Sequence, residues 1–210
     1  MILTVGNLKG GVGKTTLALN LAIEFSRAGR DVLLIDAEGT AATFTALRAE
    51  KHGKSDYTAI SLQGVAIRQQ MKSLAEKYND VVLDIGGEDE SGSLRAALTV
   101  SDVVLIPVQP RTFSLWRADE TMEIIAEART INDRLRAVAV INEADPQGQD
   151  NNEVLTSLKE TQGLEVAPFV IGRRKAFPNA QAAGLSVMEY RTDPKASAEM
   201  QQLINLLTTF

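Results

Sequence analysis

A glycine-rich loop near the start of the chain constrains the fold more than any other feature. Residues 6–16 read GNLKGGVGKTT; they follow a short apolar run at residues 2–5 and open a helical pattern. Glycines let successive backbone N–H groups turn toward one anion without Cβ clashes, and a helix that starts near Gly13 adds the positive end of its dipole. The pattern therefore predicts a phosphate-binding loop between a buried strand and a helix.

Two side chains of this loop suit a nucleoside triphosphate. We expect Lys14 to reach the β- and γ-phosphates and the Thr15 hydroxyl to complete the ligand shell of Mg²⁺. The loop departs from the general pattern G-x-x-x-x-G-K-[ST], because Leu8 stands at the first glycine position. It also carries an extra lysine, Lys9, and so more positive charge than one triphosphate needs. A glycine-rich turn without a ligand is the alternative interpretation.

Short apolar runs alternate with helical patterns along the rest of the chain. The runs lack polar alternation, as expected for strands buried on both faces of a sheet. This order predicts an α/β fold: one domain over residues 1–210, with a mostly parallel twisted sheet and helices on both faces. The predicted strands are residues 2–5, 31–35, 80–84, 103–106 and 137–141, and the predicted helices are residues 16–28, 64–78, 115–132, 152–162 and 196–209.

Composition excludes several kinds of site. The 210 residues contain no cysteine, which rules out disulfide scaffolds, zinc-finger frameworks and cysteine-ligated iron–sulfur clusters. No apolar run approaches the ~20 residues of a membrane span, and we expect no signal peptide. Because the net charge is −5, contact with nucleic acid requires a local basic patch. We predict a surface position for His52, the single histidine, and packing or an interface for Trp116.

Carboxylates end two of the predicted strands. Asp36 ends the run LLID and is followed by Glu38, and Asp84 ends the run VVLD. A carboxylate that leaves a strand tip beside the phosphate loop can hold the water shell of Mg²⁺ or orient an attacking water. Gly86 and Gly87 let the backbone pass close to a γ-phosphate. For Glu38, a solvated loop acid is the alternative.

The loop also carries a family resemblance. Residues 9–16, KGGVGKTT, resemble the deviant Walker A box of the ParA/MinD ATPases, P-loop NTPases of the SIMIBI class. The similarity covers most of the chain, and the segments IGRRKAF and AGLSVME resemble the tail of short ParA proteins. The resemblance implies a P-loop NTPase that binds ATP and Mg²⁺ and hydrolyses ATP to ADP and phosphate. It further implies an ATP-dependent homodimer in which Lys9 acts in trans and Lys14 in cis.

Individual residues take their expected functions from this resemblance. In the family segment D-x-D-P-Q the second Asp positions the hydrolytic water; Glu38 stands there, and Gly39 and Thr40 replace the Pro-Gln. Asn142 is expected to hydrogen-bond the adenine ring, with a turn-initiating Asn as the alternative. The expected catalytic residues are Lys9, Lys14, Asp36 and Glu38. The expected metal-site residues are Thr15, Asp36 and Asp84. The expected ATP-binding residues are Lys9, Gly10, Gly11, Val12, Gly13, Lys14, Thr15, Thr16 and Asn142.

The resemblance favours a short ParA-type ATPase that moves plasmids, chromosome origins or protein cargo. Such proteins bind DNA non-specifically as ATP dimers and are released when a small partner protein, ParB-like or a cargo adaptor, stimulates hydrolysis. We expect a cytoplasmic, nucleoid-associated protein that does not bind membranes, because no Lys or Arg follows Lys195 and the last apolar stripe suits packing on the sheet. The basic residues expected to contact DNA are Arg173, Arg174, Lys175, Arg191 and Lys195, with a solvated charge cluster as the alternative.

Other functions stay open at this point. A ligase or synthetase of the same superfamily, of the dethiobiotin or cobyrinate type, transfers the phosphoryl group of ATP to a small carboxylate. A MinD-like membrane-associated positioning ATPase and a nucleotide-binding scaffold that barely hydrolyses ATP are further alternatives.

Overall fold

Seven strands form one parallel sheet in the part of the chain that the structure describes. The computed structural model describes residues 1–86, 92–110, 115–145, 148 and 150–210, and only the backbone of residues 115–119, so the predictions for Gly87 and the Trp116 side chain lie outside it. The strand order is β3-β2-β4-β1-β5-β6-β7. The strands are β1 (Ile2–Val5), β2 (Val32–Asp36), β3 (Thr58–Ser61), β4 (Asp80–Asp84), β5 (Val103–Val108), β6 (Arg136–Ala144) and β7 (Glu165–Gly172).

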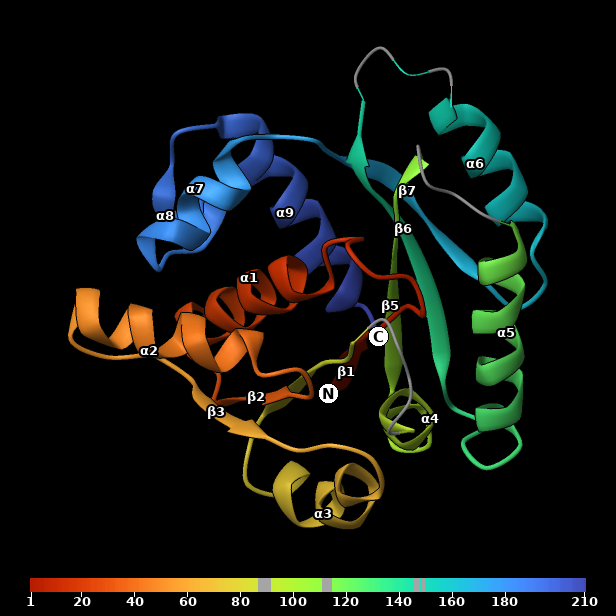
Figure 1. Ribbon diagram of the computed structural model, residues 1–210, viewed down its shortest axis with the longest axis horizontal. Helices are drawn as coiled ribbons and strands as arrows, with labels where there is room; N and C mark the ends of the chain where they lie inside the picture. Colours follow the sequence, from red (N-terminus) through yellow and green to blue (C-terminus); the bar gives the residue numbers. More distant parts are fainter. Residues whose placement is uncertain (87–91, 111–114, 146–147, 149) are drawn as a thin grey trace.

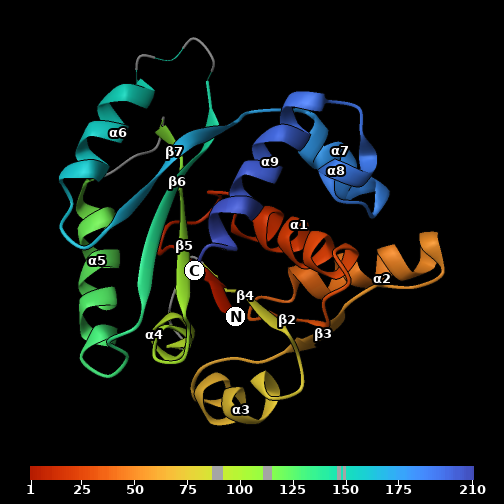
Figure 2. The same cartoon turned by 180° about the vertical axis from the view of Figure 1, so that it is seen from behind.

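Helices cover both faces of this sheet, as Figures 1 and 2 show from opposite sides. One layer contains α1 (Lys14–Arg27), α2 (Thr40–His52), α7 (Ala176–Ala183), α8 (Val187–Tyr190) and α9 (Pro194–Leu207). The opposite layer contains α3 (Val65–Ala75), α4 (Ser93–Leu98), α5 (Leu115–Arg129) and α6 (Asp150–Glu160). No helix among the described residues is long and apolar enough to cross a bilayer.

The central strands bury apolar side chains on both faces, as their sequences predict. In β2, Leu34 packs into the core beneath α1, whereas its neighbours Leu33 and Ile35 pack into the core beneath α3 and α4. Alternate residues of a strand point to opposite faces, so a strand covered on both sides must be apolar throughout. In α9, Met200 and Leu203 are fully buried, which confirms that the last apolar stripe packs inside the domain.

The order of the strands places the phosphate loop at a switch in chain direction. Strand β1 lies between β4 and β5; the chain continues from β1 toward one edge of the sheet and from β5 toward the other. In open parallel sheets such a switch leaves a crevice at the carboxyl ends of the strands, where ligands bind. The loop after β1 therefore opens into this crevice.

A buried arginine ties α2 to α8 behind the nucleotide side of the domain. Arg48 is 2% exposed and donates two hydrogen bonds to the Glu189 carboxylate, at 2.8 and 2.9 Å. It also donates to Asp56, at 2.9 Å, and to the carbonyl of Gly184, at 2.9 Å. A planar guanidinium that serves several acceptors at once cannot be replaced by a shorter or single-ended cation. His52 is exposed, as predicted, at the end of the same helix.

We expect Arg48→Met to lower the free energy of unfolding by about 3 kcal/mol, because it leaves the half-buried Glu189 carboxylate with only the more distant Arg27, at 3.8 Å, as a cation. Urea denaturation measures this. Lys54→Met is the matched control: Lys54 pairs with the same Asp56 but is 77% exposed, so its loss should cost less than about 1 kcal/mol. If the two variants lose the same free energy of unfolding, the burial of the Arg48 network contributes nothing to stability.

Candidate nucleotide-binding site

The phosphate loop joins β1 to α1 through glycines in conformations that other residues avoid. Gly11 has φ +72° and Gly13 has φ +90°, and Gly13 is the N-cap of α1. A Cβ on Gly13 would also collide with the side-chain amide of Asn142. Glycine is thus required at this position both for backbone conformation and for space. The left-handed turns bring the loop N–H groups and the start of α1 to one side, as an anion site needs.

Side-chain amides from neighbouring strands hold the loop in this shape. Gln109, at the end of β5, and Asn142, on β6, donate to the carbonyls of Gly11 and Val12, each at 2.8 Å. Asn7 donates to a carbonyl of β5 at 2.9 Å and accepts the N–H of Lys9 at 3.0 Å. Sequence reasoning missed Asn7 and Gln109, because nothing in their spacing relates them to a loop that only the strand order brings near.

Lys14 lies inside the loop. Its side chain is 6% exposed, and its Nζ donates to the carbonyl of Lys9 at 2.7 Å. Burial lowers the pKa of Lys14, and the negative charges of Glu38 and Asp84 oppose that shift. An ammonium group with one backbone acceptor in a cradle of N–H groups is suited to receive phosphate oxygens.

Asp84, at the end of β4, is suited to a metal ligand. The carboxylate is 1% exposed, and one of its oxygens, Oδ2, has no hydrogen-bond partner. Burial raises the pKa of Asp84 to about 7; the Asp36 and Glu38 charges add to the shift, while a hydrogen bond from Thr15 and the charge of Lys14 oppose it. A carboxylate oxygen and a threonine hydroxyl are donors that Mg²⁺ accepts together with phosphate and water. The residues present therefore fit Mg²⁺.

The Asp36 carboxylate accepts hydrogen bonds from backbone N–H groups. Its Oδ1 accepts the N–H groups of Glu38, at 2.9 Å, and Gly39, at 2.7 Å, and its Oδ2 accepts that of Ala42, at 2.8 Å. These bonds fix the turn from β2 into α2, where orphan N–H groups need acceptors. The expected catalytic and metal functions of Asp36 stay predictions, and this structure gives its carboxylate a structural function.

Glu38 faces the same site from the loop before α2. Its carboxylate lies so close to Gly86 that a Cβ on Gly86 would overlap it. Its negative charge also acts to raise the pKa of Lys14 and that of Asp84. The fold thus brings Lys14, Glu38 and Asp84 together from three separate segments, in agreement with their predicted grouping. Among the described residues, no three acidic, histidine or cysteine side chains form a metal cluster.

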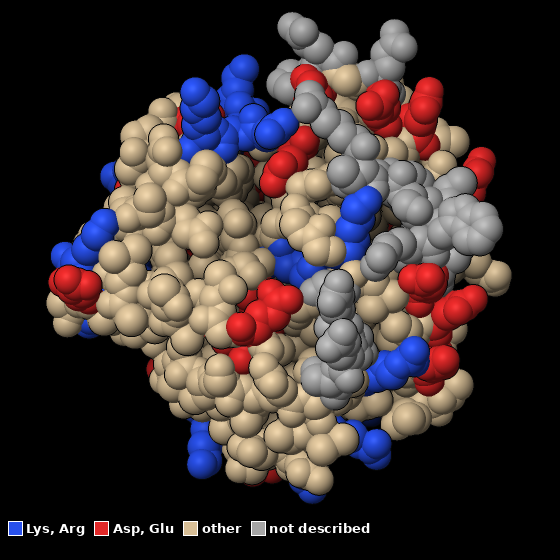
Figure 3. All heavy atoms as spheres, viewed as in Figure 1, with Lys and Arg blue, Asp and Glu red and all other residues tan. Residues whose placement is uncertain are grey.

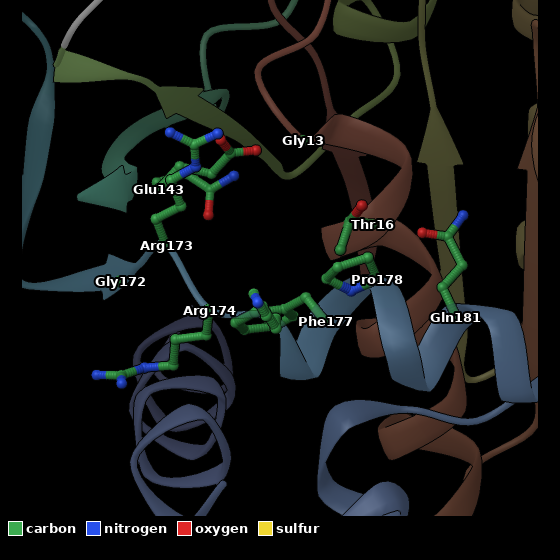
Figure 4. A pocket seen from close by; sticks show the side chains of 11 residues that line it. Gly13, Thr16, Glu143, Gly172, Arg173, Arg174, Phe177, Pro178 and Gln181 are labelled. Atoms are coloured by element: carbon green, nitrogen blue, oxygen red, sulfur yellow. The ribbon is translucent and has the colours of Figure 1, made fainter. Parts of the chain in front are cut away.

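A cavity of about 570 Å³ continues from the loop toward β7 and α7. Figure 4 shows it from close by, with Gly13 and Thr16 on one side and Phe177 and Pro178 on another. The cavity has the size of a small-molecule site and begins at the first turn of α1. Asn142 also lines it, but one of its amide hydrogens is held by the phosphate loop, so contact with adenine stays a prediction.

The basic cluster expected on DNA borders this cavity. Arg173, Arg174 and Lys175 all line it. Arg174 turns away over α9, where it forms ion pairs with Glu199, at 2.5 Å, and Asp193, at 3.5 Å. The others are exposed, as are Arg191 and Lys195 beyond α8. Figure 3 shows basic side chains gathered over the region of α7 and α9, and further basic groups near the centre of the same face.

Comparisons of sequence and of structure find similar proteins along nearly the whole chain. A sequence model of the CobQ/CobB/MinD/ParA nucleotide binding domain matches residues 3–187. Maintenance of carboxysome distribution protein A from Halothiobacillus neapolitanus is 29% identical over 205 residues, covering 97% of this chain and 94% of that protein. The chromosome-partitioning ATPase Soj from Thermus thermophilus is 27% identical over 229 residues, covering 93% and 91%. The structure of apo McdA from Cyanothece matches with a TM-score of 0.80 at 19% identity, covering 98% of each chain, and confirms the predicted fold class.

The raised pKa of Asp84 predicts a pH-dependent stability for the protein without nucleotide or metal. The pKa of this acid is about 7 in the folded protein and about 3.9 in the unfolded chain. Between those values the folded state holds the proton more tightly, so the free energy of unfolding falls as pH rises. Asn carries no such charge. We therefore expect the Tm of Asp84→Asn, relative to wild type, to rise by at least ~2 °C between pH 5 and pH 8.

Thermal unfolding at the two pH values measures this difference. Asp36→Asn is a second test: it weakens acceptors of backbone N–H groups and should lower Tm at both pH values. It also removes a charge that raises the pKa of Asp84, so the pH dependence of its Tm should lie between those of wild type and Asp84→Asn. A Tm difference between Asp84→Asn and wild type that does not change with pH would contradict the assignment.

Proposed function

The chain belongs to the CobQ/CobB/MinD/ParA nucleotide-binding domain family, and from this premise we propose that it is a ParA-type ATPase that positions or partitions a cargo. The observation that carries the proposal is the convergence of Lys14, Glu38 and Asp84 on a glycine loop that contains a second lysine, Lys9. Relatives along nearly the whole chain include a carboxysome distribution protein and a chromosome-partitioning ATPase, which supports positioning over small-molecule synthesis.

ATP binds, in this proposal, with its phosphates in the loop and its nucleoside in the adjoining cavity. Lys14 leaves the carbonyl of Lys9 and turns its ammonium to the phosphate oxygens. Thr15 and Asp84 hold Mg²⁺, which when bound neutralises charge that develops on the transferring phosphoryl group. The orphan oxygen of Asp84 and the buried ammonium of Lys14 both gain partners in this way.

Glu38 orients the water that attacks the γ-phosphorus. The water oxygen forms a bond to phosphorus while the bond to the β–γ bridging oxygen breaks, giving ADP and phosphate. A carboxylate that approaches the backbone at Gly86 is suited to this positioning, and a side chain with an extra rotatable bond predicts slow hydrolysis in the absence of a partner. Slow hydrolysis keeps the ATP state until a small partner protein stimulates release.

Lys9 completes the site of a second copy. Two triphosphates that face each other across an interface bring about eight negative charges together, so closing the interface needs cations supplied across it. The N–H of Lys9 donates to the Asn7 side chain, and this bond remains when Lys14 leaves the Lys9 carbonyl for the phosphates. Its side chain is half-buried at the loop surface, which supports action on the partner's nucleotide.

We expect Lys9→Ala to bind Mg-ATP but to stay monomeric, whereas wild type forms a dimer with a non-hydrolysable ATP analogue. Light scattering on both proteins, with ADP as the reference state, measures this. Lys72→Ala, on the exposed side of α3, should dimerise like wild type. A Lys9→Ala dimer as tight as that of wild type would remove the trans function.

DNA phosphates bind the exposed basic residues near α7 and the start of α9. Arg174 contributes little of its charge there, because Glu199 and Asp193 already pair with it. Arg191 and Lys195 are exposed and lie apart from the nucleotide cavity, so they are the better test of DNA contact than the cavity-lining Arg173 and Lys175. Contacts of this kind are independent of sequence and weaken steeply with salt.

The double variant Arg191→Glu with Lys195→Glu should lose ATP-dependent DNA binding and keep ATP-dependent dimerisation. Fluorescence anisotropy with a labelled duplex of arbitrary sequence, repeated over a salt series, gives the affinity. Replacing Lys72 and Lys77, two exposed lysines on and just after α3 in the opposite helix layer, with Glu makes the same change in net charge and serves as the control. If both double variants bind DNA equally, the DNA surface lies elsewhere.

A further inference from the structure

Glu143 has a backbone conformation that its residue type disfavours. Its φ is +54°, and within the described part of the chain only Arg191 shares a positive φ among non-glycine residues. A left-handed conformation costs a non-glycine residue about 1 kcal/mol or more, and it persists where the surrounding structure fixes it. Such outliers concentrate at binding sites, which makes the surroundings of Glu143 informative.

The end of the sheet fixes this conformation. The pairing of β6 with β7 shifts register between Ile141 and Ala144, and the N–H of Arg173 donates to the carbonyl of Ala144 at 2.9 Å. The backbone around Glu143 thus leaves the regular ladder while both flanks stay paired. As a result Glu143 lines the cavity that continues from the phosphate loop. Figure 4 shows its side chain and that of Arg173 pointing toward one another at one end of the cavity.

A carboxylate at this position is unexpected in an anion-binding cavity. A triphosphate bound at Gly13 would repel it, and Arg173 and Lys175, which also line the cavity, would offset that repulsion. A carboxylate is a hydrogen-bond acceptor only, with about four acceptor sites on its two oxygens. Arg173 faces Glu143 from one side, so a further donor has to come from the ligand. A triphosphate has none at neutral pH, whereas a nucleoside has sugar hydroxyls and, in adenosine, the 6-amino group of the base.

We infer that Glu143 selects the nucleoside of the bound nucleotide by accepting a hydrogen bond from a donor on its sugar or base. This inference rests on the proposed function, since it needs a nucleotide with its phosphates in the loop. Asn142, the neighbouring residue, has one amide hydrogen held by Val12, which leaves Glu143 as the acidic acceptor among the residues that line the cavity. The strain at Glu143 is then the cost of turning a charged acceptor to the ligand.

Calorimetric titration with ATP, 2′-deoxy-ATP and inosine triphosphate, each with Mg²⁺, tests the inference on wild type and Glu143→Gly. We expect Glu143→Gly to bind ATP roughly tenfold more weakly, the loss of one hydrogen bond to a charged acceptor. We also expect wild type to discriminate against one analogue and Glu143→Gly to lose that discrimination. If the discrimination that disappears is the one against 2′-deoxy-ATP, the donor is the ribose 2′-hydroxyl. If it is the one against inosine triphosphate, the donor is the 6-amino group of adenine.

Glycine at this position removes the strain, so Glu143→Gly should fold at least as stably as wild type. Glu160→Gln, an exposed acid on α6, should leave all three affinities unchanged. Wild-type affinities in Glu143→Gly, or an equal loss for all three nucleotides, would overturn the inference while leaving the proposed function intact. Failure of wild type to bind any nucleotide, or binding that survives Lys14→Met, would overturn both.

Discussion

The phosphate loop keeps its shape because amide side chains from adjoining strands hold it, and the rest of the site depends on that. Gln109, just after β5, and Asn142, on β6, lie 98 and 130 residues beyond the loop residues that they contact, and each donates to one loop carbonyl. The strand order that places β1 beside β5, with β6 next, is what brings them there. Without these bonds the glycines that permit the turn would also let it collapse into other conformations.

Two ionisable groups of the site, Lys14 and Asp84, are buried at a cost in free energy that a bound nucleotide with magnesium would reduce. Burial lowers the pKa of Lys14 and raises that of Asp84, so the free protein disfavours the charged forms of both groups. Phosphate oxygens at Lys14 and a divalent cation at Asp84 would favour the charged forms again. This coupling ties ligand binding to the free energy of the folded state, as expected where stability is given up for function.

The sequence predicted the centre of the fold better than its edges. The runs at β1, β2, β4, β5 and β6 are apolar throughout because both faces are covered, and they were recognisable for that reason. Strands β3 and β7 are the two edges of the sheet, and their side chains are partly exposed. The four residues of β3 include two polar ones, and β7 has Pro168 in an otherwise apolar run, which argues against a strand unless it lies at an edge. Helix α2 was missed because it buries only a few residues among polar ones, Arg48 included.

Much of the candidate site followed from motifs, and the remainder depends on tertiary structure. Lys14, Glu38 and Asp84 come together as their motifs predicted. The backbone bonds of Asp36 and the position of Arg173 and Lys175 beside the nucleotide cavity require the strand order and the path of β7. The strained backbone of Glu143 likewise has no signature in the residue type.

The central claim is that this preformed loop binds the phosphates of ATP through Lys14. Calorimetric titration of Mg-ATP into wild type and Lys14→Met tests it most directly, because the substitution keeps the length and apolar stem of the side chain and removes the charge. Burial disfavours the charged form of Lys14 and lowers its pKa, so an apolar side chain of similar length should be accommodated and the variant should fold. The account predicts saturable binding to wild type and a loss of at least about 100-fold in Lys14→Met. Equal affinities would contradict it.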